Sequence, residues 1–177
     1  MSFLTNLRAD RLIADIKAAG DSGAADPNKS LEKLSKLGPS AIPRIVDALA
    51  NADRQETAGF VNVLASLIDN KSLPIVITGL SEGNQRASSA IVAALSAARG
   101  YTPQLLLPLL DDPKMPRGPI VSVLGAQKSK LGARDLLTRA YNQEPTEKAA
   151  LFRIISEIAD DSLVPELVSR LEGKDPI

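Results

Sequence analysis

The chain has 177 residues, of which 44% are hydrophobic and only 3% aromatic, so a core must be built from Leu, Ile, Val and Ala. Lys and Arg together number 21, as do Asp and Glu, and this balance gives no net field to attract nucleic acid or an anionic membrane. The chain has no Cys, which excludes disulfides, and no His, which removes the commonest general base and metal ligand. We therefore expect a cytoplasmic protein without His- or Cys-based catalysis.

The N-terminal segment predicts one amphipathic helix over residues 3–19. Its apolar residues recur at steps of three and four: Phe3, Leu4, Leu7, Leu12, Ile13 and Ile16. The segment becomes charged too early for a signal peptide, and no stretch of the chain approaches the length of a membrane span, so we expect no membrane partner. Residues 20–28 are rich in Gly, Asp, Ser and Pro. We interpret residues 1–29 as an N-terminal capping helix and a connector.

The repeat region begins near Ser30, a candidate N-cap. Within this region one sequence motif occurs five times. Its anchors are spaced by 31, 29, 31 and 31 residues, and they are Pro43, Pro74, Pro103, Arg134 and Pro165. Hydrophobic residues follow each anchor at two, three and six positions. Pro suits the start of a helix, because its missing N–H would have no intrahelical partner there.

A second apolar stripe precedes each anchor, so each unit is predicted as a helix, a tight turn and a Pro-started helix. Residues 30–177 then hold five helical pairs, which gives an all-α fold of about eleven helices. A fixed period of this length is typical of stacked repeats, so Ile45, Val46, Leu49 and their equivalents should be buried. Small residues in the first helices, such as Ala90 and Ala93, should allow close approach between helices.

The last unit contains the stretch DSLVPELVSRLEGKDP, residues 161–176. It resembles the HEAT repeat, in the short bacterial-type variety also seen in phycobilin lyases. The resemblance covers about residues 30–177 and implies a right-handed α-α superhelix, a HEAT-like solenoid of the kind that most often serves as a scaffold for other proteins. Arg134 departs from its Pro pattern, and Pro108 falls where the pattern expects a helix interior.

Residues 173–177 are interpreted as the start of a sixth unit. A natural solenoid normally closes with a polar capping repeat. We therefore expect either that the chain is the N-terminal fragment of a longer protein or that another subunit associates with the exposed C-terminal repeat.

The resemblance also implies a binding surface, because the second helices of HEAT-like solenoids line the concave side. Positions one, four and eight residues after each anchor should face that groove, and the candidate protein-binding residues among them are Arg44, Asp47, Ile75, Thr78, Glu82, Gln104 and Leu107. Ile75 and Leu107 are expected to form an exposed apolar pair. Beside them, Pro108 should leave the carbonyl of Gln104 without its helical donor. We expect a protein or peptide partner to bind there.

We predict no catalytic, cofactor or metal residues. Residues 23–30 approach a phosphate-binding loop, but Asn28 stands where a second Gly is needed, and the acidic pairs 111–112 and 160–161 lack further oxygen ligands at EF-hand-like spacing. The predicted function is therefore that of a non-catalytic scaffold or regulatory domain that binds protein through its concave face.

Two enzyme alternatives follow from the resemblance: a phycobilin lyase or isomerase, and an alkylpurine DNA glycosylase. No residues indicate a tetrapyrrole pocket. A glycosylase would present aromatic side chains and a basic groove, whereas this chain has no Trp and no net positive charge, which disfavours nucleic acid as a partner.

Overall fold

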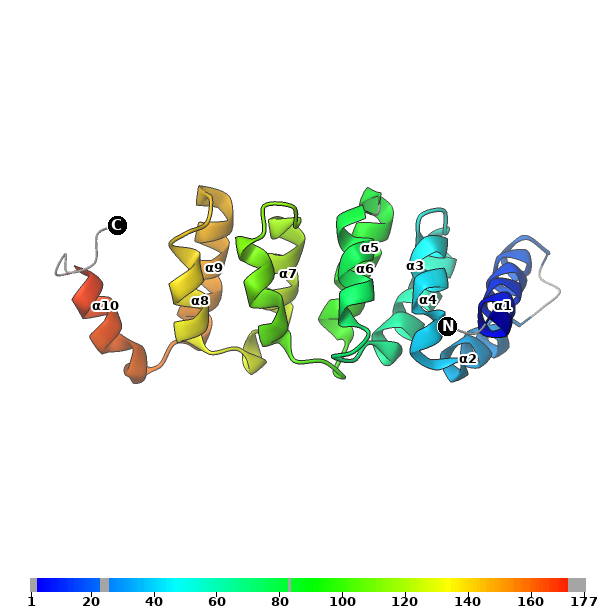
Figure 1. Cartoon of the computed structure of the whole chain (residues 1–177), viewed down its shortest axis with the longest axis horizontal. Helices are drawn as coiled ribbons and strands as arrows, with labels where there is room; N and C mark the ends of the chain where they lie inside the picture. Colours follow the sequence, from blue (N-terminus) through cyan, green and yellow to red (C-terminus); the bar gives the residue numbers. More distant parts are fainter. Residues whose placement is uncertain (1–2, 23–25, 83, 172–177) are drawn as a thin grey trace. The chain divides into compact units, whose positions relative to one another are not determined.

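The computed structural model describes residues 3–22, 26–82 and 84–171, which are helical with no β-strand among them (Figure 1). The α-helices are α1 (Phe3–Ser22), α2 (Pro27–Lys36), α3 (Ile42–Leu49), α4 (Arg54–Leu67), α5 (Leu73–Glu82), α6 (Gln85–Ala97), α7 (Arg117–Ala126), α8 (Ala133–Ala140), α9 (Pro145–Ile158) and α10 (Val164–Leu171). The 3₁₀ helices are η1 (Gly38–Ala41), η2 (Pro103–Asp111), η3 (Lys128–Lys130) and η4 (Asp161–Leu163). The ten α-helices and the nine-residue η2 agree with the expected eleven.

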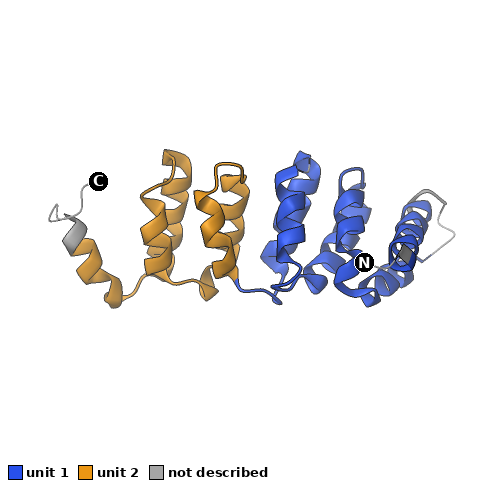
Figure 2. Cartoon of the chain, viewed as in Figure 1, with its two compact units in different colours: residues 1–102 blue, residues 103–177 orange. Residues whose placement is uncertain are grey.

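The chain divides into two compact units, residues 1–102 and 103–177 (Figure 2). Unit 1 contains α1 to α6, and unit 2 runs from η2 to α10. The boundary falls in the link between α6 and η2.

Unit 1 consists of three helical hairpins in two layers. α1 packs against α2, α3 against α4, and α5 against α6, as Figure 1 shows. Across the hairpins, α2, α4 and α6 form one layer, while α1, α3 and α5 form the other. In unit 2, η2 pairs with α7 and α8 with α9 in the same way.

This pairing differs from the expected one, in which each Pro-started helix pairs with the helix before it. The reason lies in the links. α5 ends at Glu82 and α6 begins at Gln85, and so short a link favours an antiparallel hairpin. By contrast, α4 and α6 end in extended residues, Ile68 and Ala98, which lead the chain away to the next hairpin. α1, expected to cap the stack, is therefore the first helix of a hairpin with α2.

Helix α2 begins earlier than the sequence suggested. Its N-cap is Asp26, whose carboxylate accepts the backbone N–H of Asn28 at 3.0 Å, and Pro27 is its first residue. Ser30, the expected N-cap, lies inside the helix. Because α1 extends to Ser22, the connector is shorter than expected, and its residues 23–25 lie outside the described residues.

The predicted buried stripes are largely confirmed. Ile45 and Leu49 of α3 are buried, whereas Val46 is only half-buried. The equivalents in α5 and α8 are also buried: Val76, Ile77, Leu80, Leu136, Leu137 and Ala140. In α1, Ile13 and Ile16 are buried, but Leu4 and Leu7 are exposed.

The third repeat is shifted by one residue from the predicted register. Leu107 is 5% exposed, while Leu105, predicted to be buried, is 47% exposed. Pro43, Pro74, Arg134 and Pro165 are each the second residue of their helix, whereas Pro103 is the first residue of η2. Gln104 is thus the true equivalent of the anchors, and the spacings become 31, 30, 30 and 31. The Pro at 103 marked a helix start but not the anchor position.

Helix α10 also differs from its equivalents. Val164 and Val168 are 51% and 45% exposed, whereas the corresponding Leu73 and Ile77 of α5 are buried. No later helix among the described residues covers this side of α10. The predicted start of a sixth unit at residues 173–177 lies outside the described residues.

Candidate functional site

Two loops of unit 1 are joined side by side and form a fixed edge. Asp69 and Gly100 form an isolated parallel β-bridge. The side-chain oxygen of Asn70 accepts the backbone N–H of Thr102 at 2.7 Å, and its amide nitrogen donates to the Thr102 hydroxyl at 3.3 Å. These bonds link the end of α4 to the end of α6, so the edge holds adjacent hairpins in register.

Next to this edge, Ile75 borders a hollow of about 260 Å³. The other walls come from η1 and the link before α5, and they are Pro39, Ser40, Asp69, Lys71 and Ser72. Ile75 is 37% exposed although its side chain is large and apolar. The backbone N–H of Ser72 donates to the Asp69 carboxylate at 2.7 Å and holds the pKa of that carboxyl below its usual range. The hollow thus combines an apolar wall with a carboxylate fixed by its own loop.

The other predicted groove residues of unit 1 are on α3 and α5. Arg44 of α3 forms an ion pair with Asp10 of α1, with 3.4 Å between Nε and Oδ1. Its Nη1 also lies 3.7 Å from Oδ2 of Asp47 on the same helix. Thr78 is exposed and donates its hydroxyl to the carbonyl of Pro74. Glu82, the last residue of α5, is also exposed. These four predicted groove residues are polar and lie on α3 and on α5, the helix that contains Ile75.

Gln104 and Leu107 lie in unit 2 and do not behave as predicted. The side chain of Gln104 donates to the carbonyl of Lys130, which links η2 to η3. Leu107 is buried, so the expected exposed apolar pair with Ile75 is wrong. Because η2 is a 3₁₀ helix, in which the carbonyl of residue i accepts from residue i+3, the expected partner of the Gln104 carbonyl is Leu107 rather than Pro108. The predicted free acceptor is therefore also wrong.

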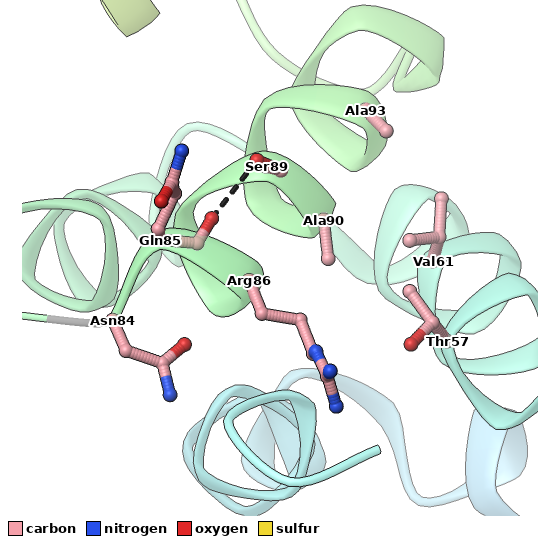
Figure 3. A pocket seen from close by; sticks show the side chains of 8 residues that line it. All are labelled: Thr57, Val61, Asn84, Gln85, Arg86, Ser89, Ala90 and Ala93. Carbon is pink, nitrogen blue, oxygen red and sulfur yellow. Dashed lines mark hydrogen bonds between the residues drawn. The ribbon is translucent and has the colours of Figure 1, made fainter. Parts of the chain in front are cut away.

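A larger open hollow of about 680 Å³ lies between α4 and α6 (Figure 3). Thr57 and Val61 of α4 line one side, and Ser89, Ala90 and Ala93 of α6 line the other. Asn84, Gln85 and Arg86 complete the lining at the start of α6. Ala93 was expected to allow close helix approach, but it is exposed and leaves space beside α4 instead.

Arg86 is held in place at this hollow by a contact between hairpins. Its Nη1 donates to the backbone carbonyl of Ala52 at 3.1 Å, in the link between α3 and α4. Asn84, the N-cap of α6, accepts the N–H of Ala87 and donates to the carbonyl of Ala50 at 3.0 Å. Both bonds tie the start of α6 to the preceding link, so the guanidinium is positioned before any ligand binds.

A third hollow, of about 410 Å³, lies where α1, α2 and α4 meet. Its apolar part includes Ile16, Leu31 and Gly59, and its only charged lining residues are Asp53 and Glu56. These two form a capping box at the start of α4: each carboxylate accepts the backbone N–H of the other residue. Both carboxylates are therefore already engaged in capping α4.

Nowhere among the described residues do three Asp or Glu side chains converge as metal ligands would. No helix in the described ranges is both long enough and apolar enough to cross a bilayer.

Comparison of the chain with protein-family models, with curated proteins and with solved structures found no match.

Sequence reasoning missed the hollow with Arg86. The sequence shows only an Arg at position 86, followed by the small residues Ala87, Ser88, Ser89 and Ala90. Its partner Ala52 lies 34 residues earlier and contributes only a backbone carbonyl, which no side-chain pattern reveals.

Proposed function

We propose that this protein is a non-catalytic helical-repeat scaffold that binds a partner protein through the face of unit 1 centred on Ile75. The observation that carries the proposal is the exposed Ile75, which borders a hollow whose other walls include the polar Ser40, Asp69, Lys71 and Ser72. The predicted groove residues Arg44, Asp47, Thr78 and Glu82 lie on α3 and α5. An apolar centre with a polar rim is the usual composition of a protein-binding surface.

The fixed edge of the hollow supports this function further. Because the loop that contains Asp69 and Asn70 is hydrogen-bonded within itself at Ser72 and to the neighbouring loop at Thr102, the hollow is preformed. A preformed site loses little conformational entropy when a partner binds. The partner would place an apolar side chain against Ile75.

The test begins with isolation of a partner by affinity capture and measurement of its dissociation constant. Ile75→Glu should weaken binding at least about tenfold, since it places a charge at the apolar centre. Arg153→Glu, at an exposed position of α9 in unit 2, is the matched control and should leave the affinity unchanged. Equal affinities of both variants, with helical content intact by circular dichroism, would refute the proposed face.

The phycobilin lyase or isomerase alternative has a direct test of its own. Mixing the purified protein with bilin and recording an absorbance spectrum would reveal a bound tetrapyrrole. A stoichiometric spectral change would replace the scaffold proposal with a phycobilin lyase or isomerase.

We also propose that both units belong to one HEAT-like superhelix. The support is their common plan, in which a Pro-started or Arg-started helix is followed by a longer helix that packs against it. Small-angle scattering of the whole chain should give the elongated profile of a solenoid.

A further inference from the structure

The hollow between α4 and α6 has a single ionisable residue in its lining, Arg86. Among the described residues Arg86 forms no ion pair, and its side chain makes one hydrogen bond, the donation from Nη1 to the Ala52 carbonyl at 3.1 Å. A guanidinium has five N–H donors in a rigid plane, so one such bond leaves an edge available to a planar anion. The bond to Ala52 also fixes the direction of the side chain.

The two hydroxyl groups of the hollow are already engaged as donors. Ser89 donates its hydroxyl to the carbonyl of Gln85 at 2.9 Å, as the dashed line in Figure 3 shows. Thr57 donates its hydroxyl to the carbonyl of Asp53. The lining also includes the neutral side chains of Asn84 and Gln85, so Arg86 is the charged donor of the hollow. Figure 3 shows its side chain extending from α6 toward the side on which Thr57 lies.

The lining of the hollow indicates the charge of the ligand. Arg86 supplies one positive charge, whereas Asp53 and Glu56, which are close to Ala52 and Thr57 in the sequence, line a different hollow and cap α4. A carboxylate carries one negative charge and matches the planar guanidinium, so a single Arg can pair with it one to one.

The shape of the hollow indicates a peptide rather than a small molecule. It is open along two helices, and its apolar part is formed by Val61, Ala90 and Ala93. One ion pair in contact with water contributes little to affinity, so a free carboxylate would bind weakly. A peptide would add contacts along the apolar side chains.

We infer that the hollow between α4 and α6 is a second protein-binding site, which takes an acidic peptide segment of a partner with its carboxylate on Arg86. This site is independent of the Ile75 face, because it lies in the other helix layer of unit 1. Failure of one proposal therefore leaves the other intact.

The inference is tested by fluorescence anisotropy with two fluorescein-labelled decapeptides of Ala, Val and Glu or of Ala, Val and Gln. The Glu peptide should bind about two- to fivefold tighter than the Gln peptide at low salt, which is the range expected for one ion pair in contact with water. The difference should shrink as salt is added. Equal affinity of the two peptides would overturn the inference.

Substitutions in and near the hollow test whether the Glu peptide binds there. Arg86→Gln should reduce the affinity for the Glu peptide to that for the Gln peptide, whereas Arg99→Gln, beyond the other end of the same helix, should have no effect. Ala93→Glu leaves Arg86 unchanged and places a negative charge in the hollow, so it should also weaken binding at least about tenfold. Its control is Ala97→Glu, an exposed position one turn further that does not line the hollow.

Two outcomes would contradict the site even if the Glu peptide binds. Unchanged affinity in Ala93→Glu would place the peptide elsewhere. Displacement of the Glu peptide by sodium acetate at a similar concentration would show that the hollow takes a free carboxylate and not a peptide. Nuclear magnetic resonance shifts at Val61 and Ala90 on peptide addition would support the proposed location.

Discussion

Gly100 lies so close to the backbone of Ile68 that an ideal Cβ on Gly100 would be 2.4 Å from the Ile68 carbonyl oxygen. Its φ is not positive, so the Gly is needed for space rather than for backbone conformation. The same approach allows the bridge between Asp69 and Gly100 and the two bonds between Asn70 and Thr102. One residue without a side chain thus permits adjacent hairpins to join at their loops.

Gly100→Ala should therefore destabilise the protein. Relief of the clash requires the two loops to separate, and we expect the free energy of unfolding to fall by about 1–3 kcal/mol. Urea unfolding followed by circular dichroism measures this. The control is Gly118→Ala in α7, where the nearest atom is 4.0 Å from the added Cβ and where Ala is the better helix former. Gly118→Ala should be at least as stable as wild type, and a Gly100→Ala variant of equal stability would contradict the role of the close approach.

Tyr101 connects this loop to α6 and should make the protein sensitive to high pH. Its hydroxyl donates to the carbonyl of Leu95 at 2.9 Å, and burial raises its pKa to about 12. In the unfolded chain the pKa is about 10. The proton is therefore held more tightly in the folded state, so this stabilisation is complete below pH about 10 and is lost between about 10 and 12.

The measurement is the tyrosinate absorbance together with the urea midpoint over this pH range. Tyr101→Phe should cost about 1–2 kcal/mol at neutral pH, because the Leu95 carbonyl loses a donor. It should also lose less stability than wild type as the pH rises from about 10 to 12. Identical pH profiles of both proteins would show that Tyr101 does not titrate as described.

Arg134 takes the place of Pro in the fourth repeat, and we expect it to contribute little to stability. Its guanidinium donates to the carbonyl of Ser162 at 3.3 Å and pairs with Glu166 at 3.1 Å, but the side chain is 66% exposed. An exposed pair of this kind contributes at most about 1 kcal/mol. Arg134→Ala should therefore lower the free energy of unfolding by less than about 1 kcal/mol, and by less still at high salt. A loss above about 2 kcal/mol in urea unfolding would show that these contacts hold α8 and α10 together.

Much of the helical fold could be predicted because the apolar spacing is strong. Residues such as Ile45, Leu80 and Leu136 recur in step with helical turns, and burial of one side of each helix follows from that period alone. Which helices pair with one another could not be predicted from the apolar period. It depends on link lengths and on the extended backbone at Ile68 and Ala98, which the apolar pattern does not encode.

In the candidate sites, too, features set by local spacing could be predicted, whereas features that depend on distant residues could not. Ile75 was predicted as exposed because its own helix places it opposite Val76 and Ile77, a purely local relationship. Arg86 was missed because its position depends on Ala52, which is distant in sequence. Leu107 was misplaced because Pro103 matched the motif one residue away from the position that the other anchors occupy.

The corrected register of the third repeat can be tested by introducing a charge at each Leu. Leu107 is 5% exposed and Leu105 is 47% exposed, so Leu107→Glu would bury a carboxylate in η2 while Leu105→Glu would leave it in water. We expect Leu107→Glu to lower the free energy of unfolding by more than about 3 kcal/mol, and Leu105→Glu to change it by less than about 1 kcal/mol. Leu107→Met keeps the volume and should cost under about 1.5 kcal/mol, which separates charge from shape. If Leu105→Glu proves more damaging than Leu107→Glu, then Leu105 is the buried residue and Pro103 is the anchor after all.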